Sequence, residues 1–228
     1  MCEDPRQYVP VSGQEWTTLE ALRSSHANVM RTEGEFPAVG VEPKFGIGQR
    51  ALLVDGVLWD CVPLLDADVG ALDAVAISHP HYYSTMVEWA QTYDCPVLIH
   101  EADREWVMRP SKRIEFWSGS TLELGSSLLI RCGGHFDGGT VLLRGESLLA
   151  GDIVQVIPDR AWVSFMYSFP NYIPLPADRV QAIADALAPH RFERIYGAWW
   201  GTVIGADGAG IVQRSAQRYI DALNGKLP

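Results

Sequence analysis

The sequence predicts an α/β protein in which two β-sheets pack together and helices cover their outer faces. Two observations predict this fold class. The chain reads as two successive blocks, and in each block short apolar strands come first and helices follow. In addition, 47% of the residues are hydrophobic and 20% are charged, which is typical of a globular protein and argues against a disordered, collagen-like or coiled-coil chain. Because each sheet must bury its apolar faces, these elements favour an αββα layering.

The first block opens with a β-hairpin. Residues 51–54 and 57–61 are apolar strands, and Asp55-Gly56 between them is a dipeptide typical of two-residue hairpin turns. Ahead of the hairpin, residues 17–22 have the pattern of a short capped helix. The other elements expected in this block are strands at 74–77 and 96–99 and helices around 85–93 and 102–108.

The second block contains the clearest helix of the chain. Val180, Ile183, Ala184 and Leu187 are spaced to lie on one face of a helix over 177–187. The other elements expected here are strands near 128–132, 141–143, 148–150 and 194–196 and a last helix from about 210 to 223. We expect residues 1–228 to form a single domain, with residues 1–50 as an irregular N-terminal extension packed on it.

Charge and hydropathy exclude several classes of partner. The chain has 18 basic and 28 acidic residues, a net charge of −10, so a nucleic-acid partner is disfavoured. No apolar run approaches the ~20 residues that cross a bilayer, and the N-terminus lacks the pattern of an export signal. We therefore expect a cytoplasmic protein that acts on a small-molecule substrate, without a membrane partner. In that setting the four cysteines are expected to be buried thiols (Cys2, Cys61, Cys95 and Cys132).

Three histidines and one aspartate stand at the ends of expected strands. His79 and His81 follow the strand at 74–77, and His135 lies in a glycine-rich turn. Asp152 follows the strand at 148–150. Each motif alone is weak evidence for a metal site. Because strand ends in layered α/β folds form the edge of a site, the presence of all of these motifs at strand ends is more specific evidence. Three imidazoles and a carboxylate suit zinc, whereas two imidazoles and a carboxylate would equally suit iron(II).

In this order the motifs resemble those of the metallo-β-lactamase superfamily. Its signature is an early Asp, a His-x-His-x-Asp-His loop, a Gly-His turn, an Asp at a strand end and a late His. Asp60, His79, His81, His135 and Asp152 match five of these positions. The resemblance implies the four-layer αββα fold, a metal held by the three histidines and Asp152, and a supporting role for Asp60, which would orient a histidine.

The chain departs from this signature at the positions that build the second metal site. Tyr83 and Ser84 stand where the loop Asp and His are expected, and residues 195–201 contain no histidine. The resemblance therefore implies one well-made metal site and a degenerate second one. We expect Tyr83 to turn inward over the first site, where its phenol would donate to developing negative charge.

The leading hypothesis is a mononuclear metal-dependent hydrolase that acts on a small ester, amide or thioester through a metal-bound water. One zinc ion is expected, with iron as the alternative, and Asp152, Asp60 and Tyr83 are the candidate catalytic residues. Two alternatives stay open: a mononuclear non-haem iron oxidoreductase that uses His79, His135 and Asp152, and a non-catalytic protein whose metal site has decayed. The aromatic segment 162–172 is either a rigid packing loop or the wall of a ligand pocket.

Overall fold

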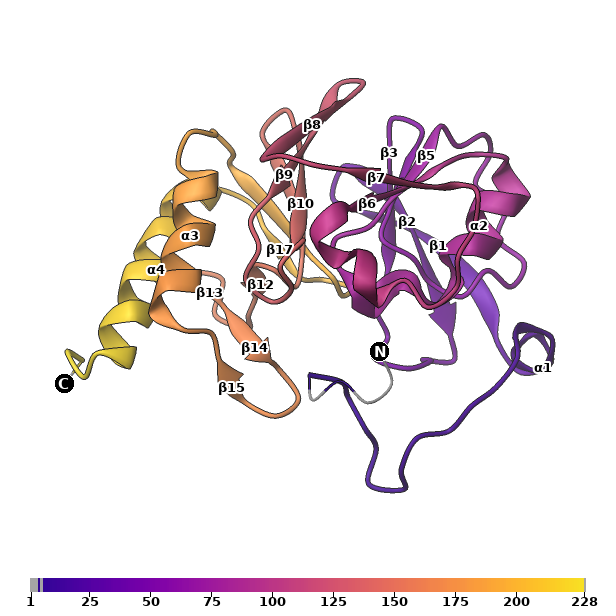
Figure 1. Cartoon of the computed structure of the whole chain (residues 1–228), viewed down its shortest axis with the longest axis horizontal. Helices are drawn as coiled ribbons and strands as arrows, with labels where there is room; N and C mark the ends of the chain where they lie inside the picture. The colour runs from indigo at the N-terminus through magenta and orange to yellow at the C-terminus, as the bar shows by residue number, and fades with distance from the viewer. Residues whose placement is uncertain (1–3, 5, 228) are drawn as a thin grey trace.

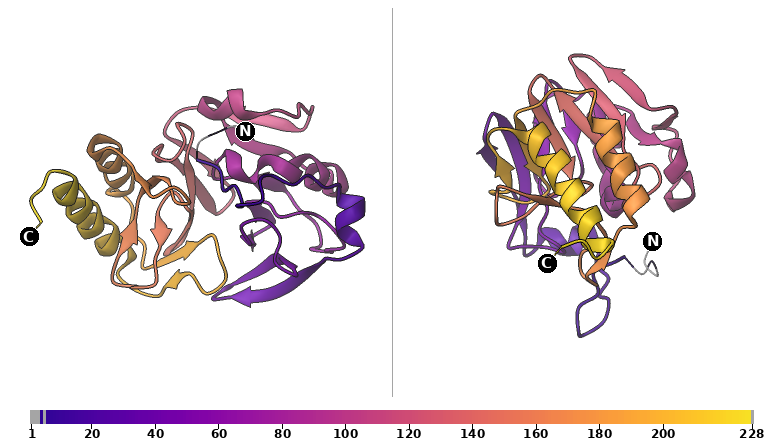
Figure 2. Two further views of the ribbon diagram at one scale, coloured as in Figure 1. Left: turned by 90° about the horizontal axis from the view of Figure 1, so that it is seen from below. Right: turned by 90° about the vertical axis from the view of Figure 1, so that its left-hand side faces the viewer.

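The protein has four layers, with two β-sheets inside and helices outside. A computed structural model describes Asp4 and residues 6–227 (Figure 1). The helix α2 (Met86–Tyr93) packs on the outer face of the first sheet, and α3 (Ala177–Leu187) and α4 (Gly208–Leu223) lie side by side on the second. The end-on view of Figure 2 shows α3 and α4 in front of the strands. The predicted αββα fold is confirmed.

The first sheet has seven strands in the order of the sequence. They are β1 (Ala27–Glu33), β2 (Phe36–Glu42), β3 (Ala51–Val54), β4 (Val57–Trp59), β5 (Ala74–Ala76), β6 (Val97–His100) and β7 (Ile114–Trp117). The pairs from β1 to β4 are antiparallel, and the pairs from β4 to β7 are parallel. Asp55 and Gly56, which join β3 to β4, have φ of 46° and 83°, as the two-residue turn predicted there requires.

The second sheet has six strands in the order β17-β16-β11-β10-β9-β8. They are β8 (Thr121–Leu124), β9 (Ser127–Arg131), β10 (Thr140–Arg144), β11 (Ser147–Gly151), β16 (Arg194–Gly197) and β17 (Val203–Ile204). Among the described strands of this sheet, β11 and β16 form the one parallel pair. Four short strands form two small sheets between β11 and α3: β12 (Gln155–Val156), β13 (Val163–Ser164), β14 (Met166–Ser168) and β15 (Ile173–Pro174).

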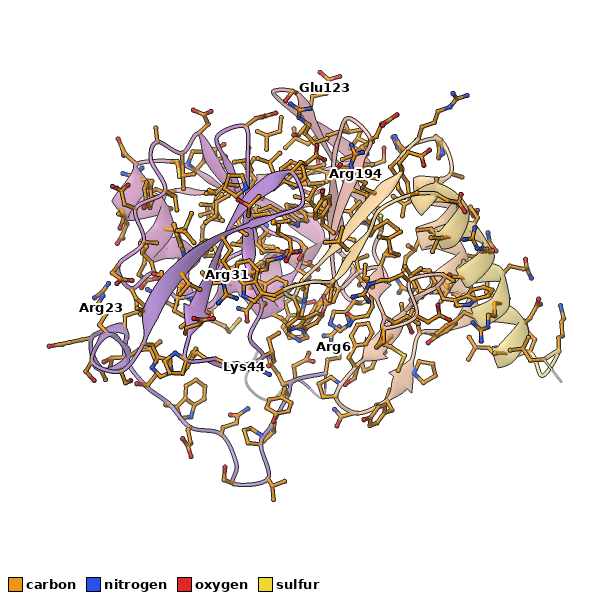
Figure 3. All side chains as sticks on the ribbon, turned by 180° about the vertical axis from the view of Figure 1, so that it is seen from behind. Arg6, Arg23, Arg31, Lys44, Glu123 and Arg194 are labelled. Atoms are coloured by element: carbon orange, nitrogen blue, oxygen red, sulfur yellow. The ribbon has the colours of Figure 1, made fainter. Side chains whose placement is uncertain are left out.

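Three apolar cores hold the four layers together, and the side chains of Figure 3 fill the space between the ribbons. The central core joins the two sheets, and its members include Leu52, Trp59, Leu129, Leu142 and Leu149. A second core lies under α2, and a third lies under α3 and α4. Each sheet therefore buries both faces, which explains why its central strands are short, continuous apolar runs.

The N-terminal region differs from the expectation of an irregular extension. β1 and β2 belong to the first sheet, and α1 (Leu19–Arg23) is the capped helix expected near 17–22, with Thr18 accepting a hydrogen bond from the amide of Ala21 at 3.1 Å. β1 has no buried residue, and β2 contains Pro37 and Gly40. Neither strand therefore has the alternating or continuous apolar pattern that identifies strands from sequence.

One further expectation needs adjustment. The helix expected at 102–108 is a 3-10 helix, η2 (Glu101–Trp106), and a second 3-10 helix, η1 (Pro80–Thr85), precedes α2.

The cysteines Cys61, Cys95 and Cys132 are buried free thiols, as expected, whereas Cys2 lies outside the described residues. Among the residues that the structure describes, no helix is long and apolar enough to cross a membrane.

Candidate metal centre

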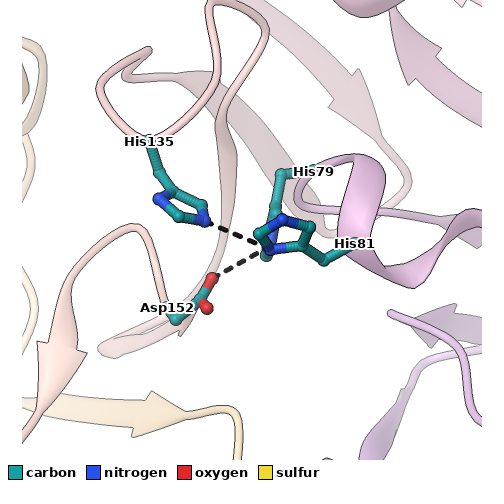
Figure 4. A group of neighbouring side chains, drawn as sticks. All are labelled: His79, His81, His135 and Asp152. Atoms are coloured by element: carbon teal, nitrogen blue, oxygen red, sulfur yellow. Dashed lines mark hydrogen bonds and ion pairs between the residues drawn. The ribbon is translucent and has the colours of Figure 1, made fainter. Parts of the chain in front are cut away.

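The four residues singled out from the sequence converge at one edge between the two sheets. His79 and His81 follow β5, His135 lies in the loop between β9 and β10, and Asp152 follows β11 (Figure 4). Each residue offers one ligand atom, and these four atoms lie within 4.8 Å of one another. Within the described part of the chain, no other group of three or more such side chains is placed to hold a metal ion.

The ring nitrogens of the histidines are oriented by neighbours outside the cluster. Nδ1 of His79 lies 2.9 Å from the hydroxyl of Ser78, and Nδ1 of His135 lies 3.0 Å from the carbonyl oxygen of Met166. Because a carbonyl oxygen only accepts, Nδ1 of neutral His135 carries the proton and Nε2 keeps a lone pair. That Nε2 faces Nδ1 of His81 at 3.2 Å, the contact drawn in Figure 4.

Several buried polar atoms of the cluster accept or donate no hydrogen bond within the part of the chain that the structure describes. Nε2 of His79 and Oδ1 of Asp152 lie 3.2 Å apart, yet neither has a hydrogen-bond partner among the described residues, and the same holds for Nε2 of His81. Buried polar groups without a partner are costly, so such an arrangement is retained where another species completes it. Three imidazole nitrogens and one carboxylate oxygen form a donor set that suits a divalent transition-metal ion.

Burial keeps this set in a form that can ligate a metal. It lowers the pKa of His135 to about 4 and that of His81 to about 3, and it lowers the pKa of His79 well below the usual range. The three imidazoles are therefore neutral at pH 7, as metal ligation requires. Burial, together with the charge of Asp60, raises the pKa of Asp152 to about 8. A bound cation would favour the ionised carboxylate instead.

Asp60 reaches the cluster through Ser78. Its Oδ1 accepts a hydrogen bond from the amide of Ser78 at 2.8 Å, and the hydroxyl of Ser78 contacts His79. Asp60 is fully buried with a φ of 64°, and burial raises its pKa to about 7. The expected contact between Asp60 and a histidine is thus indirect. Ser78 is a site residue that the sequence reasoning missed, although it directly precedes the first histidine.

The positions of the degenerate second site hold no metal-ligating side chain. Tyr83 is buried and packs in the core under α2, whereas the sequence predicts that its ring lies over the first metal site. Ser84 is exposed. Among the ring contacts described for the three histidines, the tyrosine that contributes is Tyr82, whose ring centroid lies 4.6 Å from that of His79. The catalytic role expected for Tyr83 stays a prediction.

A cavity of about 260 Å³ lies beside the cluster. His81, His135 and Asp152 line it on the metal side. Phe169 and Pro170 from the aromatic segment also line it, whereas Phe165 of the same segment is fully buried in the core under α3 and α4. Within segment 162–172, Phe165 therefore packs in the core, whereas Phe169 and Pro170 form part of the cavity wall.

The N-terminal segment contributes Arg6, which the sequence reasoning did not consider, to the same cavity. Its Nη1 donates to the carbonyl oxygen of His135 at 2.9 Å, and its guanidinium stacks over Phe136 at 3.7 Å from the ring centroid. Figure 3 shows Arg6 at the edge of the molecule where the two halves meet. No motif marks this residue, because the contact depends on how the segment folds back across the site.

Sequence comparison identifies a relative of nearly the same length. No family model matches the chain. The uncharacterized protein YmaE of Bacillus subtilis (strain 168) is 48% identical over 248 aligned positions, which cover 100% of this chain and 90% of YmaE. At this identity and coverage the two proteins share a family.

Solved structures with the same arrangement of layers are much more distant in sequence. The DIM-1 metallo-β-lactamase has a TM-score of 0.61 at 13% identity, covering 86% of this chain and 97% of that one. A B3 metallo-β-lactamase with an active-site glutamic acid has a TM-score of 0.57 at 15% identity, covering 99% and 97%. A flavoprotein from Thermotoga maritima has a TM-score of 0.61 at 12% identity, covering 88% and 62%. The chain thus has the metallo-β-lactamase fold and belongs to the family of Bacillus subtilis YmaE.

Proposed function

We propose that the protein is a metal-dependent hydrolase with a single ion, zinc, held by His79, His81, His135 and Asp152. The observation that carries the proposal is the buried cluster itself: four ligand atoms within 4.8 Å of one another, of which Nε2 of His79 and Oδ1 of Asp152 have no hydrogen bond from a described residue. A bound zinc ion lowers the pKa of a coordinated water and polarises a substrate carbonyl. A small ester, amide or thioester is the substrate class that fits.

The residues around the cluster have separate tasks in this proposal. Asp152 would complete the ligand set or hold the attacking water, since its Oδ1 lies 3.2 Å from Nε2 of His79. Asp60 fixes Ser78, and Ser78 fixes the ring of His79. A tyrosine hydroxyl donates to the charge that develops on the substrate oxygen; the candidates are Tyr83, proposed from the sequence, and Tyr82, whose hydroxyl has no hydrogen-bond partner among the described residues.

The test is turnover that depends on both the metal and its ligands. Protein purified with zinc should hydrolyse members of a panel of small aryl esters, thioesters and anilides, chelation should abolish turnover, and added zinc should restore it. His135→Ala should lose the metal and turnover together. Turnover that survives both chelation and His135→Ala would refute the proposal.

The fold comparison favours a second candidate, an iron-dependent oxidoreductase. The Thermotoga maritima structures of this fold include flavo di-iron proteins, one of them a mutant form with a TM-score of 0.57 at 13% identity. In this chain, His79, His135 and Asp152 would supply the two imidazoles and one carboxylate that suit iron(II). Elemental analysis of protein from cells grown without added zinc discriminates the two: iron at one equivalent, with oxygen consumption on reduction, would favour the oxidoreductase.

A further inference from the structure

We propose that the cavity beside the metal centre receives an uncharged apolar acyl or aryl group, and that the Asp4–Arg6 pair excludes substrates with a carboxylate at that position. The inference rests on the proposed hydrolase function and names its substrate class. It follows from the shape and walls of the cavity and from the charge balance of its N-terminal wall.

The walls away from the metal are largely apolar. Phe45, Ile47, Phe169, Pro170 and Trp199 line the cavity. Trp199 stands in the stretch where the superfamily has its last histidine, and its indole N–H donates to the carbonyl oxygen of Ile47 at 2.9 Å. The indole N–H is therefore satisfied within the protein, and the ring is an apolar wall.

The size of the cavity limits the group that it accepts. A cavity of about 150 Å³ is large enough to bind benzene. At about 260 Å³ this cavity has room for one aromatic ring with a short linker, or for a short acyl chain. A substrate with its scissile carbonyl at the cluster would therefore place one such group against Phe169 and Trp199.

Arg6 is the one permanent cation among the described residues that line the cavity, and its charge is already neutralised. Nε donates to Oδ1 of Asp4 at 2.8 Å, and Nη2 donates to Oδ2 of the same carboxylate at 2.5 Å. Nη1 donates to the carbonyl oxygen of His135. Asp4 is 2% exposed and Arg6 11% exposed at the side chain, so the pair is buried and bidentate.

A substrate carboxylate at this wall would have to displace Asp4 from Arg6. That exchange would leave the Asp4 carboxylate buried without its cation, which is strongly unfavourable. A neutral group would not have to displace Asp4 from Arg6. The pair therefore selects against anionic substrates, because the Asp4 carboxylate already binds the Arg6 guanidinium. The aromatic face of Phe136 holds the guanidinium in place.

The experiment compares two esters that differ in one group: 4-nitrophenyl pentanoate and the mono-4-nitrophenyl ester of glutaric acid, which ends in a carboxylate. The wild-type zinc enzyme should prefer the neutral ester in kcat/KM by at least tenfold. Asp4→Asn frees the guanidinium and should shift this ratio at least tenfold towards the anionic ester. The double variant Asp4→Asn/Arg6→Gln removes both charges and should return the preference to the neutral ester.

Asp207→Asn is the matched control, because it makes the same charge change and breaks the ion pair with Arg214 but does not line the cavity. Its ratio should stay within twofold of wild type. An equal preference in wild type, or an unchanged ratio in Asp4→Asn, would overturn the inference.

A binding measurement separates this inference from the hydrolase proposal. Calorimetric titration of the metal-free protein with 4-phenylbutyramide and with 4-phenylbutyrate needs neither metal nor turnover. Wild type should bind the amide at least tenfold more tightly, and Asp4→Asn should reduce that difference at least tenfold. Failure of all ester hydrolysis with these binding results intact would refute the hydrolase and keep the cavity assignment. Equal binding of the two probes to wild type would overturn the cavity assignment, whatever the enzyme hydrolyses.

Discussion

Nε2 of His79 lies 3.2 Å from Oδ1 of Asp152, and within the described part of the chain neither atom forms a hydrogen bond. The two residues come from different sheets, since His79 follows β5 and Asp152 follows β11. The alignment of the two sheets thus brings together two buried groups that do not satisfy each other. A cation between them would relieve the burial cost of both, which links metal binding to the stability of the interface between the sheets.

The first prediction concerns metal content. Wild-type protein purified without chelators should hold one equivalent of zinc or iron, because one complete set of ligands is present and the second site has lost its imidazole and carboxylate positions. His135→Ala should remove the metal. Elemental analysis of both proteins provides the measurement, with His190→Ala as the control, since His190 lies outside the cluster. Two tightly held ions per chain would contradict a single site.

The second prediction is a pH dependence of the metal-free protein. The pKa values of Asp152 and Asp60 in the folded state are raised to about 8 and about 7, so between pH 6.5 and 8.5 the folded state holds protons that the unfolded state has released. Stability must therefore fall as the pH rises through this window. The histidines have lowered pKa values in the folded state, whereas an unfolded histidine is still partly protonated near pH 6.5, so they oppose part of the fall at the lower end of this window.

The expected fall in the free energy of unfolding is about 2 kcal/mol between pH 6.5 and 8.5, from roughly 1.4 kcal/mol per pKa unit for each proton. Denaturant titration after chelation measures it. Asp152→Asn should remove most of the slope, and saturating zinc should abolish it in wild type. A metal-free protein that is equally stable at both pH values would show that Asp152 is ionised in the free cluster.

The third prediction separates the two adjacent tyrosines. Tyr82 contacts the ring of His79, whereas Tyr83 packs in the core under α2. If the donor is Tyr83, as proposed from the sequence, Tyr83→Phe should lower kcat about tenfold or more and leave metal content unchanged. If Tyr82 is the donor, Tyr82→Phe should have this effect instead. Steady-state kinetics and metal analysis of both variants decide between them, and wild-type kcat in both would exclude a tyrosine donor.

The sequence identifies the four candidate ligands because each follows a strong local signal. His79, His81 and Asp152 come directly after buried apolar strands, and glycines flank His135. The parts that could not be predicted lack such signals. β1 has no buried residue, so no apolar periodicity marks it, and Arg6 reaches the site only because its segment folds back to contact the backbone of His135. Long-range contacts of this kind leave no trace in local spacing.

Local sequence patterns cannot predict which of the two adjacent tyrosines, Tyr82 or Tyr83, faces the metal site. Spacing within the loop places Tyr83 at the position of a lost ligand, and the sequence predicts that its phenol lies over the first metal site; the ring is buried in the core under α2. Which of two adjacent rings faces His79 depends on the backbone between them. That backbone is the 3-10 helix η1. A change in backbone geometry of this kind decides which side chain points to the site.

The last prediction uses a pair of glycines with nearly the same positive backbone φ. Gly151, directly before Asp152, has a φ of 55°, and a Cβ there would lie 2.8 Å from the hydroxyl of Ser78 and 3.3 Å from Oδ2 of Asp60. Gly145 has a φ of 56°, and a Cβ there would meet nothing within 4 Å. Both substitutions to alanine should cost about 1 kcal/mol of stability from backbone strain.

Only Gly151→Ala should also disturb the metal centre, because its methyl group must displace Ser78, which orients His79. We expect at least a tenfold loss of zinc affinity in Gly151→Ala and wild-type affinity in Gly145→Ala, as a competition titration against a chromophoric chelator would measure. Denaturant titration of the metal-free proteins gives the stability cost of each substitution, so the difference in zinc affinity reports the contacts with Ser78 and Asp60. Equal zinc affinities in two equally destabilised variants would show that Ser78 does not position the histidine.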